Sequence, residues 1–181
     1  RARELIRQEA LEEAIRPLER AIELFPYAAG QGSPYELLAD VYRRLDRPDN
    51  LVAALESWWK RSPKSSERAE ELARMLAERD RREEAVEVLK HSMFSDPFSE
   101  KAHQLLGRLL LELDRPQEAV VEFQVRLAMQ PVDEATARFD LAQALMRNGD
   151  REAARRQVLL ALEIAPRFSD AQALLLEIVR Q

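Results

Sequence analysis

The sequence contains no cysteine and only two histidines, His91 and His103, in 181 residues. Without cysteine the chain can form no disulfide and has no thiol chemistry, and this fits an oxidising and a reducing compartment equally well. Two histidines are too few for a His-rich metal cluster, and neither an HExxH segment nor a serine-type triad can be assembled from them. We therefore predict no catalytic residue, no metal and no cofactor.

Long apolar runs and an excess of basic charge are also missing. Although 46% of the residues are hydrophobic, no run of about 18 apolar residues occurs, so no membrane-spanning helix is predicted. The net charge is −5, and basic residues alternate with acidic ones, as from Arg79 to Glu84. A nucleic-acid binder normally carries a basic stripe that neutralises phosphates. We therefore expect neither a membrane nor a nucleic acid as partner.

Glycine is scarce, and one of the four glycines lies inside a spaced pattern. The pattern is His103-x₂-Leu106-Gly107-x₂-Leu110, then Ala119-x₃-Phe123, then Pro131. It resembles a unit of the tetratricopeptide repeat family, with His103 and Leu110 in place of the usual tryptophan and tyrosine. In such a unit the small residues Gly107 and Ala119 let two antiparallel helices approach, and Phe123 fills the space beside them. Proline then ends the second helix.

The pattern returns along the chain. Pro63, Pro97, Pro131 and Pro166 follow one another at intervals of 34, 34 and 35 residues. Pro26 lies 37 residues before Pro63, and the surplus falls in a loop that contains two glycines. Small residues recur in phase in the first helices (Ala39, Ala73, Gly107, Ala142) and in the second helices (Ala85, Ala119, Ala154). The resemblance implies an all-α fold, a right-handed superhelical solenoid of antiparallel helix pairs.

We divide the chain, as one domain, into a partial repeat with a loop, four full repeats and a capping helix, at residues 1–31, 32–65, 66–99, 100–134, 135–168 and 169–181. The helices after the loop are predicted at 34–45, 48–61, 66–79, 82–95, 100–113, 116–129, 134–148, 151–164 and 169–180. Before the loop we expect a first helix that is mostly missing, a turn near residues 8–10, and a kink or restart at Pro17. The chain therefore resembles a fragment of a longer protein.

Helix boundaries have their own local signals. Ser33-Pro34-Tyr35-Glu36 is a capping box, in which the serine accepts from the helix start and the glutamate reaches back. Between paired helices the family has glycine in a left-handed conformation. Gly149 keeps it, and the matching positions hold Asp46, Asp80 and Asp114. Aspartate tolerates this conformation better than most residues, so the turns should persist.

Two positions depart from the family pattern. Trp58 and Trp59 stand where a small residue is usual, and we expect at least one of them to be buried against residues 69–76, with ligand stacking as the alternative. Arg126 also replaces a small residue. A buried arginine needs a carboxylate partner, and Asp140 on the next helix is the candidate.

The resemblance implies that ligands lie in a concave groove lined by the first helices. The positions of each repeat that line this groove in the family are acidic near the start of this chain and apolar toward its end. From these positions we propose the following binding-site residues: Arg43, Arg74, Lys101, Arg108, Leu111, Phe139, Gln143 and Met146. We hypothesise that Arg74 and Arg108 bind a carboxylate. The alternative is that each pairs within its own helix, with Glu70 and Glu112 respectively. Some members of the family hold the acidic C-terminal tail of a chaperone in a clamp of lysine and asparagine side chains. We do not expect this clamp here, because Glu36 and Asp40 occupy the positions of its first lysine and asparagine.

The predicted function is that of a protein–protein interaction module or scaffold that binds a peptide or partner protein in the groove, without enzymatic activity. A looser resemblance rests on residues 34–39 and 161–166 and leads to an alternative. In it the chain is an accessory C-terminal repeat domain of a larger bacterial zinc-peptidase-like protein, and the partner is an upstream domain of the same chain. Glu100-x-x-His103 has the spacing of a metal-ligand pair, but His103 already occupies a structural position of the repeat.

Overall fold

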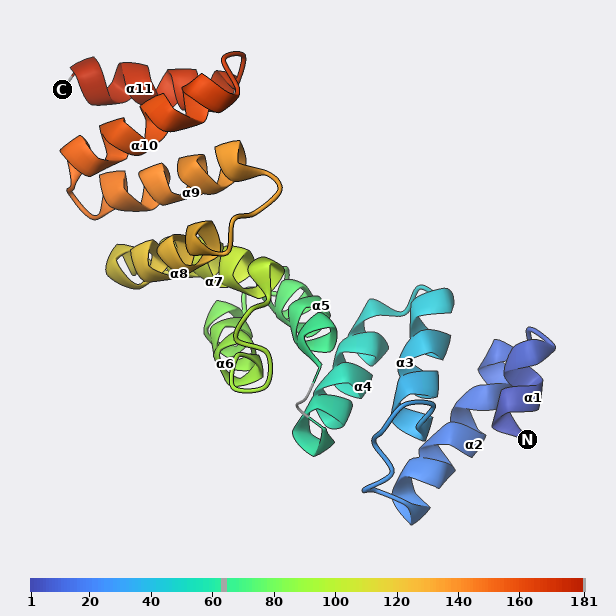
Figure 1. Cartoon of the computed structure of the whole chain (residues 1–181). Coiled ribbons are helices and arrows are strands. Elements are labelled where there is room, and N and C mark those ends of the chain that lie inside the picture. The colour runs from blue at the N-terminus through green and yellow to red at the C-terminus, as the bar shows by residue number, and fades with distance from the viewer. Residues whose placement is uncertain (63–64, 181) are drawn as a thin grey trace.

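The computed structural model describes residues 1–62 and 65–180, and this part of the chain holds eleven α-helices and no strand (Figure 1). The helices are α1 (Ala2–Arg7), α2 (Leu11–Leu24), α3 (Pro34–Arg44), α4 (Pro48–Arg61), α5 (Ser66–Ala77), α6 (Arg82–Ser92), α7 (Glu100–Glu112), α8 (Pro116–Ala128), α9 (Glu134–Arg147), α10 (Arg151–Ile164) and α11 (Ser169–Arg180). They stack as successive pairs, and the two termini lie at opposite ends of the array. The all-α prediction is confirmed, and the fold is a solenoid of helix pairs. No helix in the described ranges is long and apolar enough to cross a membrane.

The predicted helix boundaries agree with the observed ones to within three residues. The largest difference is at the end of α6, predicted at residue 95 and observed at Ser92. Pro97 disfavours a helical conformation at Asp96, and the chain leaves the helix in a turn in which the Ser95 amide donates to the Ser92 carbonyl at 2.9 Å. Pro63, one of the periodic prolines, lies outside the described residues.

The beginning of the chain differs from the prediction at one point. A short α1 is present and pairs with α2, and the turn between them falls at the predicted residues 8–10, with Glu9 in the left-handed region at φ 59°. The predicted restart at Pro17 is wrong, because α2 runs unbroken from Leu11 to Leu24. Pro17 removes only one hydrogen-bond donor from the helix. Ala14 and Leu18, on either side of it, are buried, and their packing stabilises the continuous helix.

The turns between paired helices have the predicted geometry. Asp46, Asp80 and Asp114 have φ values of 52°, 64° and 57°, and Gly149 has 88°. Each aspartate adopts this conformation at a cost of about 1 kcal/mol relative to glycine. The left-handed turn between paired helices is therefore formed by aspartate at three of these four positions and by glycine at the fourth.

The capping box before α3 is present with one change of partner. The Ser33 hydroxyl accepts from the Glu36 amide at 3.3 Å, and Pro34 occupies the first helical turn. The Glu36 carboxylate accepts from the amide of Gly32, one residue earlier than in the predicted box. The Ser33 amide already donates to the Gly30 carbonyl at 3.1 Å, so the carboxylate reaches the next available donor.

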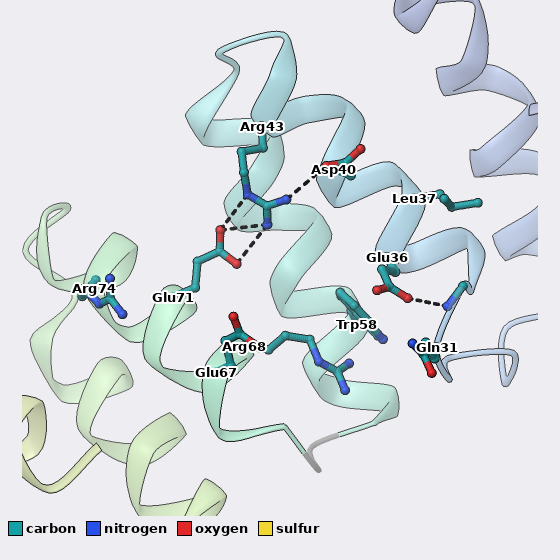
Figure 2. Close-up of a pocket in the computed structure, with 11 residues that line it drawn as sticks. Gln31, Glu36, Leu37, Asp40, Arg43, Trp58, Glu67, Arg68, Glu71 and Arg74 are labelled. Atoms are coloured by element: carbon teal, nitrogen blue, oxygen red, sulfur yellow. Dashed lines mark hydrogen bonds and ion pairs between the residues drawn. The ribbon is translucent and has the colours of Figure 1, made fainter. Parts of the chain in front are cut away.

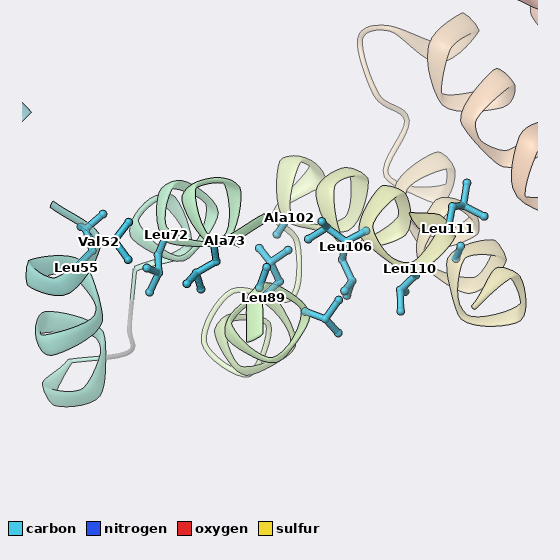
Figure 3. Packing of buried hydrophobic residues seen from close by; sticks show 14 of the residues in the cluster. Val52, Leu55, Leu72, Ala73, Leu89, Ala102, Leu106, Leu110 and Leu111 are labelled. Carbon is cyan, nitrogen blue, oxygen red and sulfur yellow. The ribbon is translucent and has the colours of Figure 1, made fainter. Parts of the chain in front are cut away.

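The core follows the array as a continuous band of buried side chains between the helices (Figure 3). Gly107 and Phe123 form the predicted close contact, because a Cβ atom at residue 107 would lie 2.6 Å from Phe123 Cε1. Ala73, Ala119 and Ala142, at in-phase positions, are fully buried. Each pair thus buries its apolar face against its neighbours, which leaves the first helices free to line a surface.

Candidate functional site

The first helices α3 and α5 border a hollow of about 710 Å³, which we call the N-terminal hollow (Figure 2). Residues of α3, α4 and α5 and the loop before α3 line it: Gln31, Gly32, Glu36, Leu37, Asp40, Arg43, Trp58, Glu67, Arg68, Glu71 and Arg74. Charged side chains dominate the wall. Two of the predicted groove residues, Arg43 and Arg74, lie here.

Both of these arginines contact carboxylates of the protein itself. Arg43 reaches across from α3 to α5, where its Nη2 lies 2.9 and 3.0 Å from the two carboxylate oxygens of Glu71. Arg74 lies 3.7 Å from Glu70 one turn earlier and is 61% exposed. The alternative pairing of Arg74 within its own helix is therefore the one observed. Glu70 itself is buried and accepts from the Ser99 hydroxyl at 2.8 Å, which ties α5 to the start of α7.

Trp58 forms part of the same wall. It is only 7% exposed, which confirms that at least one of the two tryptophans is buried. Its Nε1 donates to the Ala29 carbonyl at 2.7 Å, and the Arg68 guanidinium carbon lies 3.8 Å from its ring centroid. Trp59 is half-buried and contacts the edge of the His91 ring, with centroids 5.8 Å apart. The residue of α5 that lies over the Trp58 ring is therefore Arg68.

A second hollow, the C-terminal hollow, lies between α7, α9 and the start of α11. It has a volume of about 460 Å³ and is lined by Arg108, Leu111, Glu112, Thr136, Phe139, Asp140, Gln143, Phe168 and Asp170. A smaller hollow of about 230 Å³ shares Leu111 and Gln143 with it and adds Met146, Arg147, Leu174 and Glu177. Five predicted groove residues meet here, namely Arg108, Leu111, Phe139, Gln143 and Met146. Lys101, the eighth, is exposed on α7 and lines neither hollow.

Phe168 is a residue of this hollow that the sequence prediction missed. Its ring lies 4.8 Å from that of Phe139, centroid to centroid, at 54° between planes. It precedes α11, which occupies the place of a first helix. If the capping helix had been treated as the first helix of a further repeat, the groove would have been predicted to extend to this end of the chain.

A buried ion cluster lies beneath the C-terminal hollow. Arg126 and Asp140 are each 3% exposed, and the Arg126 Nη1 donates to an Asp140 oxygen at 2.7 Å, which confirms the predicted pair. Arg126 Nη2 also reaches Glu100 at 3.2 Å, and Gln104 Nε2 donates to Asp140 at 3.3 Å. Buried charges persist only when they are paired and hydrogen-bonded in this way.

Arg108 belongs to the same cluster and is held across the repeat boundary. Its Nη2 lies 3.2 Å from Asp140, while its side chain stays 52% exposed. The predicted alternative, a pair with Glu112 in the same helix, is wrong, because Glu112 accepts from Arg82 at 2.7 Å instead. A carboxylate on α9, the first helix of the next repeat, thus holds Arg108 beside the hollow that it lines.

His103 fixes the α7–α8 pair to the preceding loop. Its Nδ1 lies 2.6 Å from Glu122, and its Nε2 lies 3.1 Å from the Pro97 carbonyl. The hydrogen bond with Glu122 raises the pKa of His103 above its usual range, and burial opposes that shift. Glu100 contacts Arg126 instead, so Glu100 and His103 have separate partners. Within the described ranges, no group of three or more metal-ligating side chains is arranged to hold an ion.

The comparisons with known proteins agree with this geometry. Residues 135–168 match the model of the tetratricopeptide repeat. None of the curated proteins compared with the chain matches its sequence. Among solved structures, YrrB, described as a TPR protein with an unusual peptide-binding site, is similar with a TM-score of 0.73 and 20% identity, over 95% of this chain and 87% of YrrB.

Two further solved structures have the same architecture. MamA from Desulfovibrio magneticus is similar with a TM-score of 0.70 and 20% identity, over 81% of this chain and 82% of the other. PilF of Pseudomonas aeruginosa is similar with a TM-score of 0.64 and 18% identity, over 99% and 80%. At these identities the likeness concerns the fold. Residues 135–168 thus match the tetratricopeptide repeat model, and the chain as a whole has the fold of a tetratricopeptide repeat protein.

Proposed function

We propose that this chain is an interaction module that binds a peptide, or an extended segment of a partner protein, along the surface lined by α3, α5, α7 and α9. Proteins of the tetratricopeptide fold generally mediate protein–protein interactions, and in this chain we propose that the partner lies along the groove. We propose that it acts by binding rather than by catalysis. The observation that carries the proposal is the composition of the C-terminal hollow.

The C-terminal hollow has the build of a binding pocket. Leu111, Phe139 and Phe168 form the apolar part of its lining. The rest of the lining is polar or charged: Arg108, Glu112, Thr136, Asp140, Gln143 and Asp170. Peptide and ligand sites typically combine an apolar interior with a few polar groups that fix orientation, in a volume of about 300–1,000 Å³. An aromatic or aliphatic side chain of the partner would be the anchor, since such anchors dominate interface energies.

The buried ion cluster prepares Arg108 for this role. Asp140 accepts from Nη2 of the Arg108 guanidinium, and Arg126 beneath it shares the charge of Asp140. Arg108 therefore keeps donors for a partner while its position is fixed, which lowers the entropy lost on binding. A carboxylate or carbonyl next to the apolar anchor would complete the contact.

A selection of peptides against the wild-type chain tests the proposal. Dissociation constants of the selected peptides are then measured for Arg108→Ala, Phe139→Ala and Gln143→Ala, and for a triple variant with Arg74→Ala, Arg108→Ala and Phe139→Ala. Loss of an anchor contact should weaken binding at least about tenfold. Lys101→Ala is the matched control, because Lys101 lies on a lining helix but outside both hollows. Binding that survives the triple variant unchanged would contradict the proposal.

The alternative from the sequence, an accessory repeat domain of a zinc-peptidase-like protein, concerns residues outside this chain. It stays a prediction.

A further inference from the structure

Arg68 differs from the other arginines of the N-terminal hollow. Arg43 is closed onto Glu71, and Arg74 lies beside Glu70. Arg68 forms no ion pair within residues 1–62 and 65–180, although it lines the hollow. Its Nη1 is buried and has no hydrogen-bond acceptor among the described residues. A charged donor left in this state is costly, and a negative charge bound beside the guanidinium would offset part of the cost.

The position of Arg68 is fixed by Trp58. The guanidinium carbon lies 3.8 Å from the centre of the ring, which is a close cation–π contact (Figure 2). The ring is fixed in turn, because its Nε1 donates to the Ala29 carbonyl at 2.7 Å. The guanidinium is therefore oriented before any ligand arrives.

The loop that receives Trp58 is itself anchored at several points. It spans residues 25–33 and makes this interval longer than the other repeat intervals. The Tyr35 hydroxyl donates to the Pro26 carbonyl at 2.9 Å, and Arg3 Nη2 donates to the Gly32 carbonyl at 2.8 Å. Gln31 and Gly32 then line the hollow beside Arg68. The extra loop thus builds one wall of the hollow.

The charges around Arg68 select the kind of ligand that fits. Burial lowers the pKa of Arg68, and the charge of Glu36 opposes the shift. Glu71 and Asp40 are engaged by Arg43, and Glu36 accepts from the Gly32 amide. One ligand carboxylate would pair with the part of the Arg68 guanidinium that lines the hollow. A ligand with several negative charges would be repelled by Glu36 and by the exposed Glu67.

We propose that Arg68, seated on Trp58, is a carboxylate-binding subsite that takes a single carboxylate of a peptide ligand at the N-terminal end of the groove. This inference rests on the proposed peptide-binding function. It adds a residue outside the predicted groove set and gives the charge of the ligand at one end.

Two indole signals make the test direct, since Trp58 and Trp59 are the only tryptophans. In ¹H–¹⁵N spectra, Trp59→Phe assigns the Trp58 indole. The wild-type chain is titrated with three pools of N-acetylated tetrapeptides. The first has no acidic residue and a free C-terminus, the second has no acidic residue and an amidated C-terminus, and the third is amidated with one Asp or Glu. The pools carrying a carboxylate should shift the Trp58 signal, and the neutral pool should not.

Variants show whether Arg68 carries the effect. Arg68→Gln should raise the half-saturating peptide concentration about tenfold or more, and Arg68→Lys should fall between this variant and the wild type, because lysine keeps the charge without the fork. Arg61→Gln is the control and should stay near the wild-type value, because Arg61 also lies over an aromatic ring, that of Tyr27, but does not line the hollow. The ligand-free Arg68→Gln variant should keep the wild-type backbone amide spectrum away from Trp58, which verifies the fold.

The outcomes separate the two proposals. A response to the first pool alone identifies a terminal carboxylate, and a response to the third alone identifies an acidic side chain; both support the subsite. An equal shift with the neutral pool, or undiminished binding by Arg68→Gln, overturns the subsite. Shifts around the C-terminal hollow without any change at Trp58 overturn the subsite and leave the proposed function standing. If no pool shifts any signal, both proposals fail.

Discussion

The two hollows are built on the same architecture but from different chemistry. In the N-terminal hollow, most charges close on one another near the surface, as in the contact of Arg43 with Glu71. In the C-terminal hollow the buried Arg126–Asp140 pair lies beneath the exposed Arg108, and apolar side chains such as Phe139 form part of the lining. The repeat fixes where the first helices lie, and the residues at a few offsets decide what each stretch of the surface can bind.

This difference has an energetic side. Exposed ion pairs contribute about 0–1 kcal/mol each, because water screens them and ordering their long side chains costs entropy. Removing one partner of a buried pair leaves an uncompensated charge and costs about 3–5 kcal/mol. Substitutions in the two hollows should therefore affect stability very differently, even where the contacts look alike.

The largest effect should follow from removing the shared carboxylate of the buried cluster. Asp140→Ala leaves Arg126 buried without its closest counter-charge and should lower the free energy of unfolding by about 3–5 kcal/mol. Urea denaturation followed by circular dichroism measures this. The double variant Arg126→Met, Asp140→Leu removes both charges and should recover much of the loss. A fall below about 1 kcal/mol for Asp140→Ala would contradict the buried arrangement.

Trp58→Ala should cost about 3 kcal/mol, since it removes a large buried ring and releases the loop at Ala29. The matched variant is Trp59→Ala, which should cost less because Trp59 is only half-buried. Both are measured as melting temperatures and urea midpoints. Wild-type stability in both variants would place the pair on the surface.

His103 should make the stability of the α7–α8 pair depend on pH. Its pKa is raised in the folded chain by Glu122, so the stabilisation is fully present below the unfolded value of about 6.5. It is lost as pH rises through the folded pKa. The free energy of unfolding, measured from pH 5.5 to 9, should therefore fall across this window in the wild type and fall less in His103→Gln.

The smallest effect is expected in the N-terminal hollow. Arg43→Gln breaks the exposed contact with Glu71 and should change the free energy of unfolding by less than about 1 kcal/mol, and still less in high salt. A loss comparable to that of Asp140→Ala would remove the energetic distinction between the two hollows.

Much of the fold could be predicted from the sequence because its signals are local and repeated. The turns at Asp46, Asp80 and Asp114 could be predicted from the regular spacing of these residues, and Ser33 indicates the start of α3. Arg126 could be matched with Asp140 because a buried charge must find a partner nearby. Pro17 misled the prediction, since packing on both sides of it kept α2 continuous.

The details of the candidate site depend on contacts between repeats, which spacing within one helix does not contain. Arg108 and Glu112 are correctly spaced for a pair, yet each contacts a neighbouring repeat. The contact of Arg68 with Trp58 and the anchoring of Trp58 at Ala29 join three separate elements. Such contacts arise from the stacking of helix pairs.

The central claim is that partners bind on the surface lined by the first helices, with the C-terminal hollow as anchor. A map of backbone amide shifts during titration with a selected peptide tests it directly. The account predicts that the perturbed amides lie on α5, α7 and α9, with the largest changes near Leu111, Phe139 and Gln143. Perturbations confined to the second helices α4, α6, α8 and α10 would contradict it.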